Sequence, residues 1–123
     1  MQKNYIVSKS RERGVQMKEP TLGNPQNTIA VLQKYNFVFQ KKFGQNFLID
    51  THVLDKIIGS AEITKDDFVL EIGPGIGTMT QYLACAAGKV AAVEIDKALI
   101  PILEDTLDGY DNVDRKSTRL NSS

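Results

Sequence analysis

The hydrophobic positions of this chain form short apolar runs that alternate with segments of helical spacing. Phe68 to Ile72 is one apolar run and residues 89–95 are a second, and both have the length and composition of a β-strand. Apolar residues three and four positions apart predict a helix in each of three other segments. These positions are Ile29, Leu32, Tyr35 and Phe39; then Val53, Leu54, Ile57, Ile58 and Ala61; then Met79, Tyr82, Leu83 and Ala86. Strands that alternate with helices predict an α/β fold with a parallel sheet.

Polar residues mark where some of these helices begin. Asp50 or Thr51 is expected to cap the helix that follows, because a side-chain oxygen at that position accepts a hydrogen bond from a free amide of the first turn. Asp96 is expected to begin a further helix that reaches about residue 107. Pro101 fits that helix only near its first turn or at a kink, since proline has no amide hydrogen.

The segment between the first strand and its helix is rich in glycine. It runs E-I-G-P-G-I-G from Glu71 to Gly77, and glycines at alternate positions allow positive φ angles and a close approach of the backbone to a ligand. Gly73 and Gly75 are therefore expected to form the floor of a ligand site. The second strand ends in Glu94, and the carboxyl ends of neighbouring strands are where open α/β sheets bind ligands. A carboxylate at that edge can accept both hydroxyls of a ribose.

The spacing of the glycines separates two classes of nucleoside site. Dinucleotide sites use G-x-G-x-x-G and place a pyrophosphate at the helix N-terminus. Here Gly77 comes one position early and Thr78 occupies the place of the third glycine. The tighter E-x-G-x-G-x-G pattern resembles motif I of the S-adenosylmethionine-dependent methyltransferases. A plain strand-to-helix turn is the alternative, and the acidic residue at the end of the next strand favours the methyltransferase interpretation.

A further segment upstream narrows the subclass. K-K-F-G-Q-N-F-L-I-D, from Lys41 to Asp50, has no periodicity that would make it a core element. Together with E-I-G-P-G-I-G and V-E-I-D, in this order, it resembles the bacterial small-subunit ribosomal RNA adenine dimethyltransferases, relatives of the erythromycin-resistance methylases. The resemblance covers roughly residues 28–113. A capped loop that packs its two phenylalanines is the alternative explanation of the upstream segment.

The resemblance implies a Rossmann-like methyltransferase fold, S-adenosylmethionine as cofactor and dimethylation of adenine amino groups in small-subunit rRNA. In that family the Q-N-F-L segment closes over the cofactor, so Asn46 and Leu48 match binding positions. Gly73 matches the backbone contact in the glycine turn, and Glu94 matches the ribose acceptor. The implied partners are small-subunit rRNA and the precursor of the 30S subunit, and we expect a monomer.

The family's catalytic segment, N-[LI]-P-[YF] after its fourth strand, does not occur in these 123 residues, nor does the acidic residue after strand three that holds the cofactor adenine. We therefore assign no catalytic residue. We expect a Rossmann-like fold that is truncated after about two strands, and a chain that has no methyltransferase activity on its own. A non-catalytic RNA-binding or ribosome-assembly module is the alternative function. An NAD-dependent oxidoreductase is a weaker third, because Thr78 departs from the dinucleotide pattern.

The formal net charge of zero hides an uneven distribution. Residues 1–48 hold eight Lys and Arg against two Asp and Glu, whereas residues 49–113 hold four against twelve. Lys41 and Lys42 are weak candidates for RNA contact, since basic side chains bind phosphate. The basic residues nearer the N-terminus suit RNA contact or a solvated disordered tail equally well. They are Lys3, Lys9, Arg11, Arg13 and Lys18.

The two ends of the chain are expected to differ from the folded part between them. Residues 1–27 are polar and aperiodic, so we expect a disordered basic arm, of which residues 1–16 are an upstream extension if Met17 is the start. Residues 114–123 depart from the family and resemble read-through of a cloning or sequencing adapter. An ordinary flexible terminus is the alternative. Residues 28–113 are then the N-terminal part of a methyltransferase domain.

Other chemistry receives little support. The single cysteine, Cys85, excludes an internal disulfide and a C-x-x-C metal site, and it has no nearby histidine partner that would make it a nucleophile. The single histidine, His52, has no second ligand at metal-binding spacing, so we expect no metal. No apolar run is long enough for a signal peptide or a membrane span. These features predict a cytoplasmic protein without a membrane partner.

Overall fold

The computed structural model describes residues 18–36 and 49–115. Its centre is a parallel sheet in the order β1-β2-β3, formed by Phe68–Ile72, Lys89–Val93 and Val113–Asp114. The first strand has the predicted bounds and the second ends two residues early. The third strand is only two residues long, and it adds to the two strands that the sequence predicted. The predicted α/β class is confirmed.

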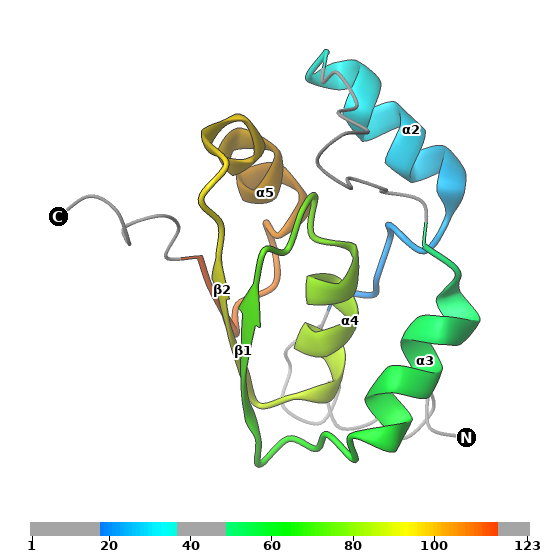
Figure 1. Ribbon diagram of the computed structural model, residues 1–123, viewed down its shortest axis with the longest axis vertical. Coiled ribbons are helices and arrows are strands. Elements are labelled where there is room, and N and C mark those ends of the chain that lie inside the picture. Colours follow the sequence, from blue (N-terminus) through cyan, green and yellow to red (C-terminus); the bar gives the residue numbers. More distant parts are fainter. Residues whose placement is uncertain (1–17, 37–48, 116–123) are drawn as a thin grey trace, which may run out of the picture.

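The helices are α2 (Pro25–Lys34), α3 (Thr51–Ser60), α4 (Thr78–Ala86) and α5 (Ile100–Thr106), and a 3₁₀ turn precedes α5 at Lys97–Leu99. In Figure 1, α4 lies alongside the strands and α3 lies beyond α4. Since α4 joins β1 to β2 and α5 joins β2 to β3, the described chain contains two successive parallel crossovers. Within the described ranges, no helix combines the length and apolar character that crossing a bilayer requires.

The predicted helix starts are confirmed at two positions. The Asp50 carboxylate accepts a hydrogen bond from the amide of His52 at 2.9 Å, so Asp50 caps α3. The Asp96 carboxylate accepts from the amide of Ala98 at 3.0 Å and begins the 3₁₀ turn. Pro101 lies in the first turn of α5. Amides of the first turn have no partner within the helix, so the missing amide hydrogen of proline costs no helical hydrogen bond there.

The core lies between the sheet and α4. Val90 is buried at the centre, with Leu83 and Ala84 of α4 against it and Val69 and Val113 from the neighbouring strands beside it. Cys85 packs against the same cluster. Burial raises the pKa of its thiol to about 11, as expected of a structural cysteine and not of a nucleophile.

The other face of β1 is exposed. Phe68, Leu70 and Ile72 have 64%, 58% and 70% of their surface accessible. The stripe predicted for α3 is also mostly exposed, and only Leu54 of that helix is buried. An amphipathic helix commonly buries its whole apolar side against a core, and α3 does not do so among the described residues. Helical spacing identified the apolar side of α3, but among the described residues only part of that side meets α4.

The segment before α2 differs from the predicted disordered arm. Leu22 is buried in a cluster with residues of the glycine turn and α5, and the hydroxyl of Tyr110 donates to the carbonyl of Glu19 at 2.7 Å. Helix α2 begins at Pro25, three residues before the predicted boundary. The prediction of disorder is therefore wrong for residues 18–27. Polar composition alone does not reveal that residues far away in the sequence form hydrogen bonds with the backbone of this segment. Residues 1–17 and 116–123 lie outside the described part of the chain.

Candidate cofactor site

The glycine turn follows the carboxyl end of β1 and leads directly into α4. Gly73, Gly75 and Gly77 have φ angles of 72°, 65° and 97°, so all three adopt the left-handed backbone that the alternate spacing predicted. The amide of Gly73 donates to the carbonyl of Val93 at 2.9 Å, which extends the pairing of β1 and β2 into the turn. The turn therefore lies at the edge of the sheet where the two carboxyl ends meet.

Gly73 and Gly77 serve different purposes. A Cβ built on Gly73 would have no atom of the described residues within 4 Å, so this side of the turn faces open space that a ligand can occupy. A Cβ on Gly77 would come within 2.9 Å of the Thr106 hydroxyl oxygen, which shows that this glycine allows close packing of α5. The open space over Gly73 fits a bound nucleoside, since a side chain there would fill it.

Glu94 lies at the end of β2 with its carboxylate against the turn. One oxygen accepts from the amide of Gly75 at 3.2 Å and the other from the amide of Asp96 at 2.9 Å. The residue is only 6% exposed. A carboxylate offers about four acceptor positions, so two amides leave capacity for ribose hydroxyls. The structure thus brings Gly73, Gly75 and Glu94 together, and the ribose role of Glu94 stays a prediction.

A second carboxylate lies under the turn. Glu71, the last but one residue of β1, accepts a hydrogen bond from the hydroxyl of Thr80 in the first turn of α4, at 2.5 Å. Burial raises the pKa of Glu71, the bond from Thr80 opposes that rise, and the charge of Glu94 adds to it. Glu71 therefore links β1 to α4, which is a structural role beside the turn.

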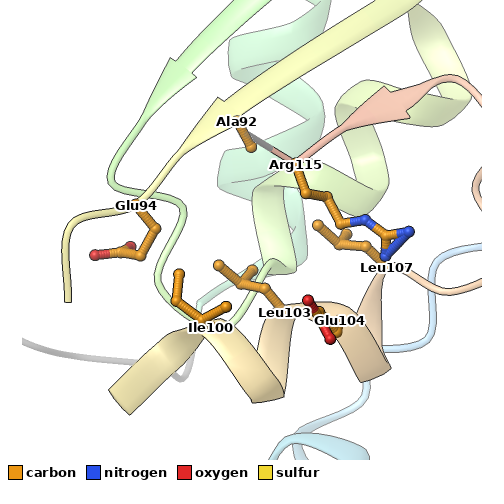
Figure 2. Close-up of a pocket in the computed structure, with 7 residues that line it drawn as sticks. All are labelled: Ala92, Glu94, Ile100, Leu103, Glu104, Leu107 and Arg115. Carbon is orange, nitrogen blue, oxygen red and sulfur yellow. The ribbon is translucent and has the colours of Figure 1, made fainter. Parts of the chain in front are cut away.

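A small cavity of about 20 Å³ lies on the α5 side of Glu94. Figure 2 shows the residues that line this cavity, which are Ala92, Glu94, Ile100, Leu103, Glu104, Leu107 and Arg115. In this view the Glu94 carboxylate points away from Arg115. A cavity of this size holds about one water molecule and cannot hold a nucleoside. The ligand site that the glycine turn indicates is therefore the open surface over Gly73.

Several predicted site residues lie outside the described ranges. Asn46 and Leu48, expected to contact the cofactor, and Lys41 and Lys42, expected to contact RNA, are among residues 37–48. Their roles stay predictions.

Three polar residues beside the glycine turn were not identified from the sequence. Thr80, Gln81 and Thr106 are buried, whereas Met79 and Tyr82 of the predicted α4 stripe are only partly buried. A search for the spacing of apolar residues cannot find polar residues that are buried. The position of Gln81 could have indicated it, since Gln81 follows Gly77 by one helical turn and therefore lies on the same side of α4.

Comparison with known proteins agrees with this geometry. Residues 36–118 match the model of the family described as "Ribosomal RNA adenine dimethylase". Ribosomal RNA small subunit methyltransferase A of Lachnoclostridium phytofermentans is 77% identical over 93 residues, which are 75% of this chain and 32% of that protein. The protein of the same name from Listeria innocua is 54% identical over 92 residues, which are 75% of this chain and 31% of that protein. The chain spans about a third of the length of these curated relatives.

A solved structure is also similar. The crystal structure of the 23S rRNA methyltransferase ErmE has a TM-score of 0.54 and 38% sequence identity, and the match covers 62% of this chain and 32% of that one. This likeness confirms the predicted Rossmann-like methyltransferase fold.

Proposed function

Since the chain belongs to the ribosomal RNA adenine dimethylase family, we propose that it forms the cofactor-binding part of an S-adenosylmethionine-dependent rRNA adenine dimethyltransferase. The observation that carries this proposal is the unit formed by the glycine turn and Glu94. The turn leaves open space over Gly73, and the carboxylate lies at the adjoining strand end. This arrangement suits a nucleoside cofactor without a pyrophosphate.

The cofactor supplies an electrophilic methyl group on a sulfonium ion. The residues of this chain bind and orient it. Gly73 and Gly75 allow the backbone to approach the ligand, and Glu94 accepts hydrogen bonds from the ribose hydroxyls while it holds the amide of Gly75. Asn46 and Leu48 contact the cofactor from the Q-N-F-L segment. This positioning is what a methyl transfer needs, because the reaction depends on an in-line approach of the nitrogen to the methyl carbon.

We propose adenine amino groups of small-subunit rRNA as the substrate, within a precursor of the 30S subunit. The relatives named for small-subunit rRNA are up to 77% identical to this chain, whereas the 23S rRNA enzyme is 38% identical. Lys41 and Lys42 would contact the RNA phosphates. We further propose that the protein acts as a cytoplasmic monomer.

The acceptor side of the reaction does not belong to these 123 residues. In the family, an N-[LI]-P-[YF] segment accepts hydrogen bonds from the adenine amino group and stacks on the base. The 123-residue sequence lacks this segment, so it carries the cofactor half of the site and no catalytic residue.

The test is tritiated methyl transfer to undermethylated small ribosomal subunits. We define the extended protein as residues 1–113 followed by the remainder of the Lachnoclostridium phytofermentans relative. The extended protein is expected to transfer methyl groups to adenine, and the 123-residue chain alone is not. A folded extended protein without transfer would count against the proposed activity. Salt-sensitive RNA binding without cofactor binding would favour the non-catalytic module.

A further inference from the structure

The side chain of Gln81 has all of its hydrogen-bonding capacity in use, although it is fully buried. Its carbonyl oxygen accepts from the amides of Thr21 and Leu22, both at 2.9 Å. Its amide nitrogen donates to the carbonyl of Thr106 at 2.8 Å and to the hydroxyl of Thr21 at 3.2 Å. Two acceptor and two donor interactions are what a carboxamide can make. Gln81 therefore joins the segment before α2 to the last turn of α5.

Thr106 carries this connection to the glycine turn. Its hydroxyl donates to the carbonyl of Ile76 at 2.7 Å, and the same oxygen lies 2.9 Å from the place that a Cβ on Gly77 would take. Ile76 is 1% exposed, so water has no access to replace this bond. Without the hydroxyl, the Ile76 carbonyl would lose a partner inside the protein, which is unfavourable for a buried acceptor.

A turn with three left-handed glycines needs such restraints. Glycine populates positive and negative φ about equally, so its preference alone does not hold the shape. Inside the turn, the amide of Gly77 donates to the carbonyl of Pro74 at 3.0 Å. Bonds to other segments join Gly73 to β2, Gly75 to Glu94 and Ile76 to Thr106. The bonds of Gly73 and Gly75 hold the half of the turn next to the sheet. The bond from Thr106 restrains the half that leads into α4 from outside the turn.

We propose that Thr106, held by Gln81, is a positioning residue that fixes the glycine turn in the shape that binds the cofactor. This inference rests on the proposed function, because it assumes that the turn is the floor of the S-adenosylmethionine site. It also assigns a purpose to residues 18–24. Their bonds to the Gln81 side chain hold the carboxamide in place while it donates to the Thr106 carbonyl.

A purely stabilising role for Thr106 is the competing explanation, and Thr28 offers a matched control. Thr28 is also buried, and its hydroxyl donates to the carbonyl of Leu22 at 3.3 Å. In both residues, replacement by valine removes one hydroxyl-to-carbonyl bond with little change of shape. Only Thr106 bonds to the glycine turn.

The experiment measures S-adenosylmethionine affinity by calorimetry and hydrogen exchange of residues 73–77 without cofactor, both in the extended protein. Thr106→Val is expected to weaken binding about five- to tenfold, the effect of one lost hydrogen bond, and to speed exchange in the turn. Thr106→Ser keeps the hydroxyl and should bind within about twofold of the original protein. Thr28→Val should lower the melting temperature, with binding and turn exchange changed less than in Thr106→Val, because Thr28 bonds the Leu22 carbonyl and not the turn.

Equal affinity and equal turn exchange in Thr106→Val and the unmodified protein would overturn the proposal, as would an equal loss of affinity in Thr28→Val. If Thr106→Val does not fold, Thr106→Ala removes the same hydroxyl without placing a methyl group against the Ile76 carbonyl, and the same results are expected. If the unmodified extended protein binds no S-adenosylmethionine, the proposed function fails. Faster turn exchange in the Thr106 variants would still support the positioning role.

Discussion

The amide of Gly75 donates a hydrogen bond to the carboxylate of Glu94 across 3.2 Å, and this bond joins the glycine turn to the end of β2. The same carboxylate accepts from the amide of Asp96, so one side chain organises two loops at the carboxyl edge of the sheet. Glu94 is thus part of the frame of the site as well as a candidate ligand. Its substitution should affect both binding and loop shape.

Replacing Glu94 by alanine in the extended protein is expected to weaken S-adenosylmethionine binding by about 1.5–3 kcal/mol, the scale for hydrogen bonds to a charged group. The fold should survive, as circular dichroism would show. Asp55→Ala serves as the control, because Asp55 is an exposed carboxylate of α3, which lies beyond α4 from the sheet (Figure 1). Calorimetry gives the affinities. If a cofactor analogue without the ribose lost the same increment, Glu94 would not be the ribose acceptor.

Gly75→Val is expected to abolish cofactor binding. Gly75 has a φ of 65°, which a β-branched side chain opposes, so the turn would lose the shape proposed to bind the ligand. Gly59→Ala in α3 is the matched control, since a Cβ there would meet no described atom within 4 Å. If the Gly75 variant folds and binds S-adenosylmethionine with unchanged affinity, this turn is not the floor of the cofactor site.

Glu71 should make stability depend on pH. Burial raises its pKa above the ordinary value of 4.5, so the folded protein retains this proton to higher pH than the unfolded chain does. The stabilising contribution is therefore complete below pH 4.5 and is lost as pH rises through the raised pKa. Glu71→Gln should therefore gain stability relative to the unmodified extended protein as pH rises above 4.5. Glu62→Gln, at an exposed position, controls for the removal of one charge.

Urea unfolding at several pH values measures this difference. A constant gap between Glu71→Gln and the unmodified protein across the range would contradict the prediction.

The apolar outer face of β1 should make the 123-residue chain self-associate. Leu70 lies in the middle of an edge strand of the described sheet, and exposed apolar edge strands pair with other chains. Sedimentation velocity should show association that increases with protein concentration, and Leu70→Lys should reduce it because a charge on the edge opposes pairing. Val53→Lys, on an exposed apolar position of α3, is the control. A monomer at all concentrations, or an equal effect of both variants, would refute this explanation.

Local features of this fold were predictable from the sequence, and long-range features were not. The bounds of β1, the caps at Asp50 and Asp96 and the left-handed glycines follow from rules that involve neighbouring residues. The buried side of α4 did not follow, because Gln81 is buried through partners 25 and about 60 positions away in the sequence. The periodicity of apolar residues gives no information about hydrogen-bond partners so far away in the sequence.

The candidate site shows the same division. The glycine spacing and the position of Glu94 at a strand end predicted that Gly75 and Glu94 lie together at the carboxyl edge of the sheet, as they do in the structure. The hydrogen bond between Gly75 and Glu94 required the register of β1 against β2, which the sequence does not specify. The restraint from Thr106 required knowledge of how α5 packs on Gly77.

The saturated carboxamide of Gln81 has an evolutionary consequence. Glutamate has the same shape but offers no donor to the Thr106 carbonyl, and methionine or leucine offers neither donor nor strong acceptor. A change at this position therefore leaves backbone groups of residues 21, 22 and 106 without this partner, and no substitution at those three positions other than proline at 21 or 22 removes one of the groups, because every other residue type presents them. Position 81 should accordingly tolerate fewer substitutions among relatives than the partly buried position of Tyr82 in the same helix.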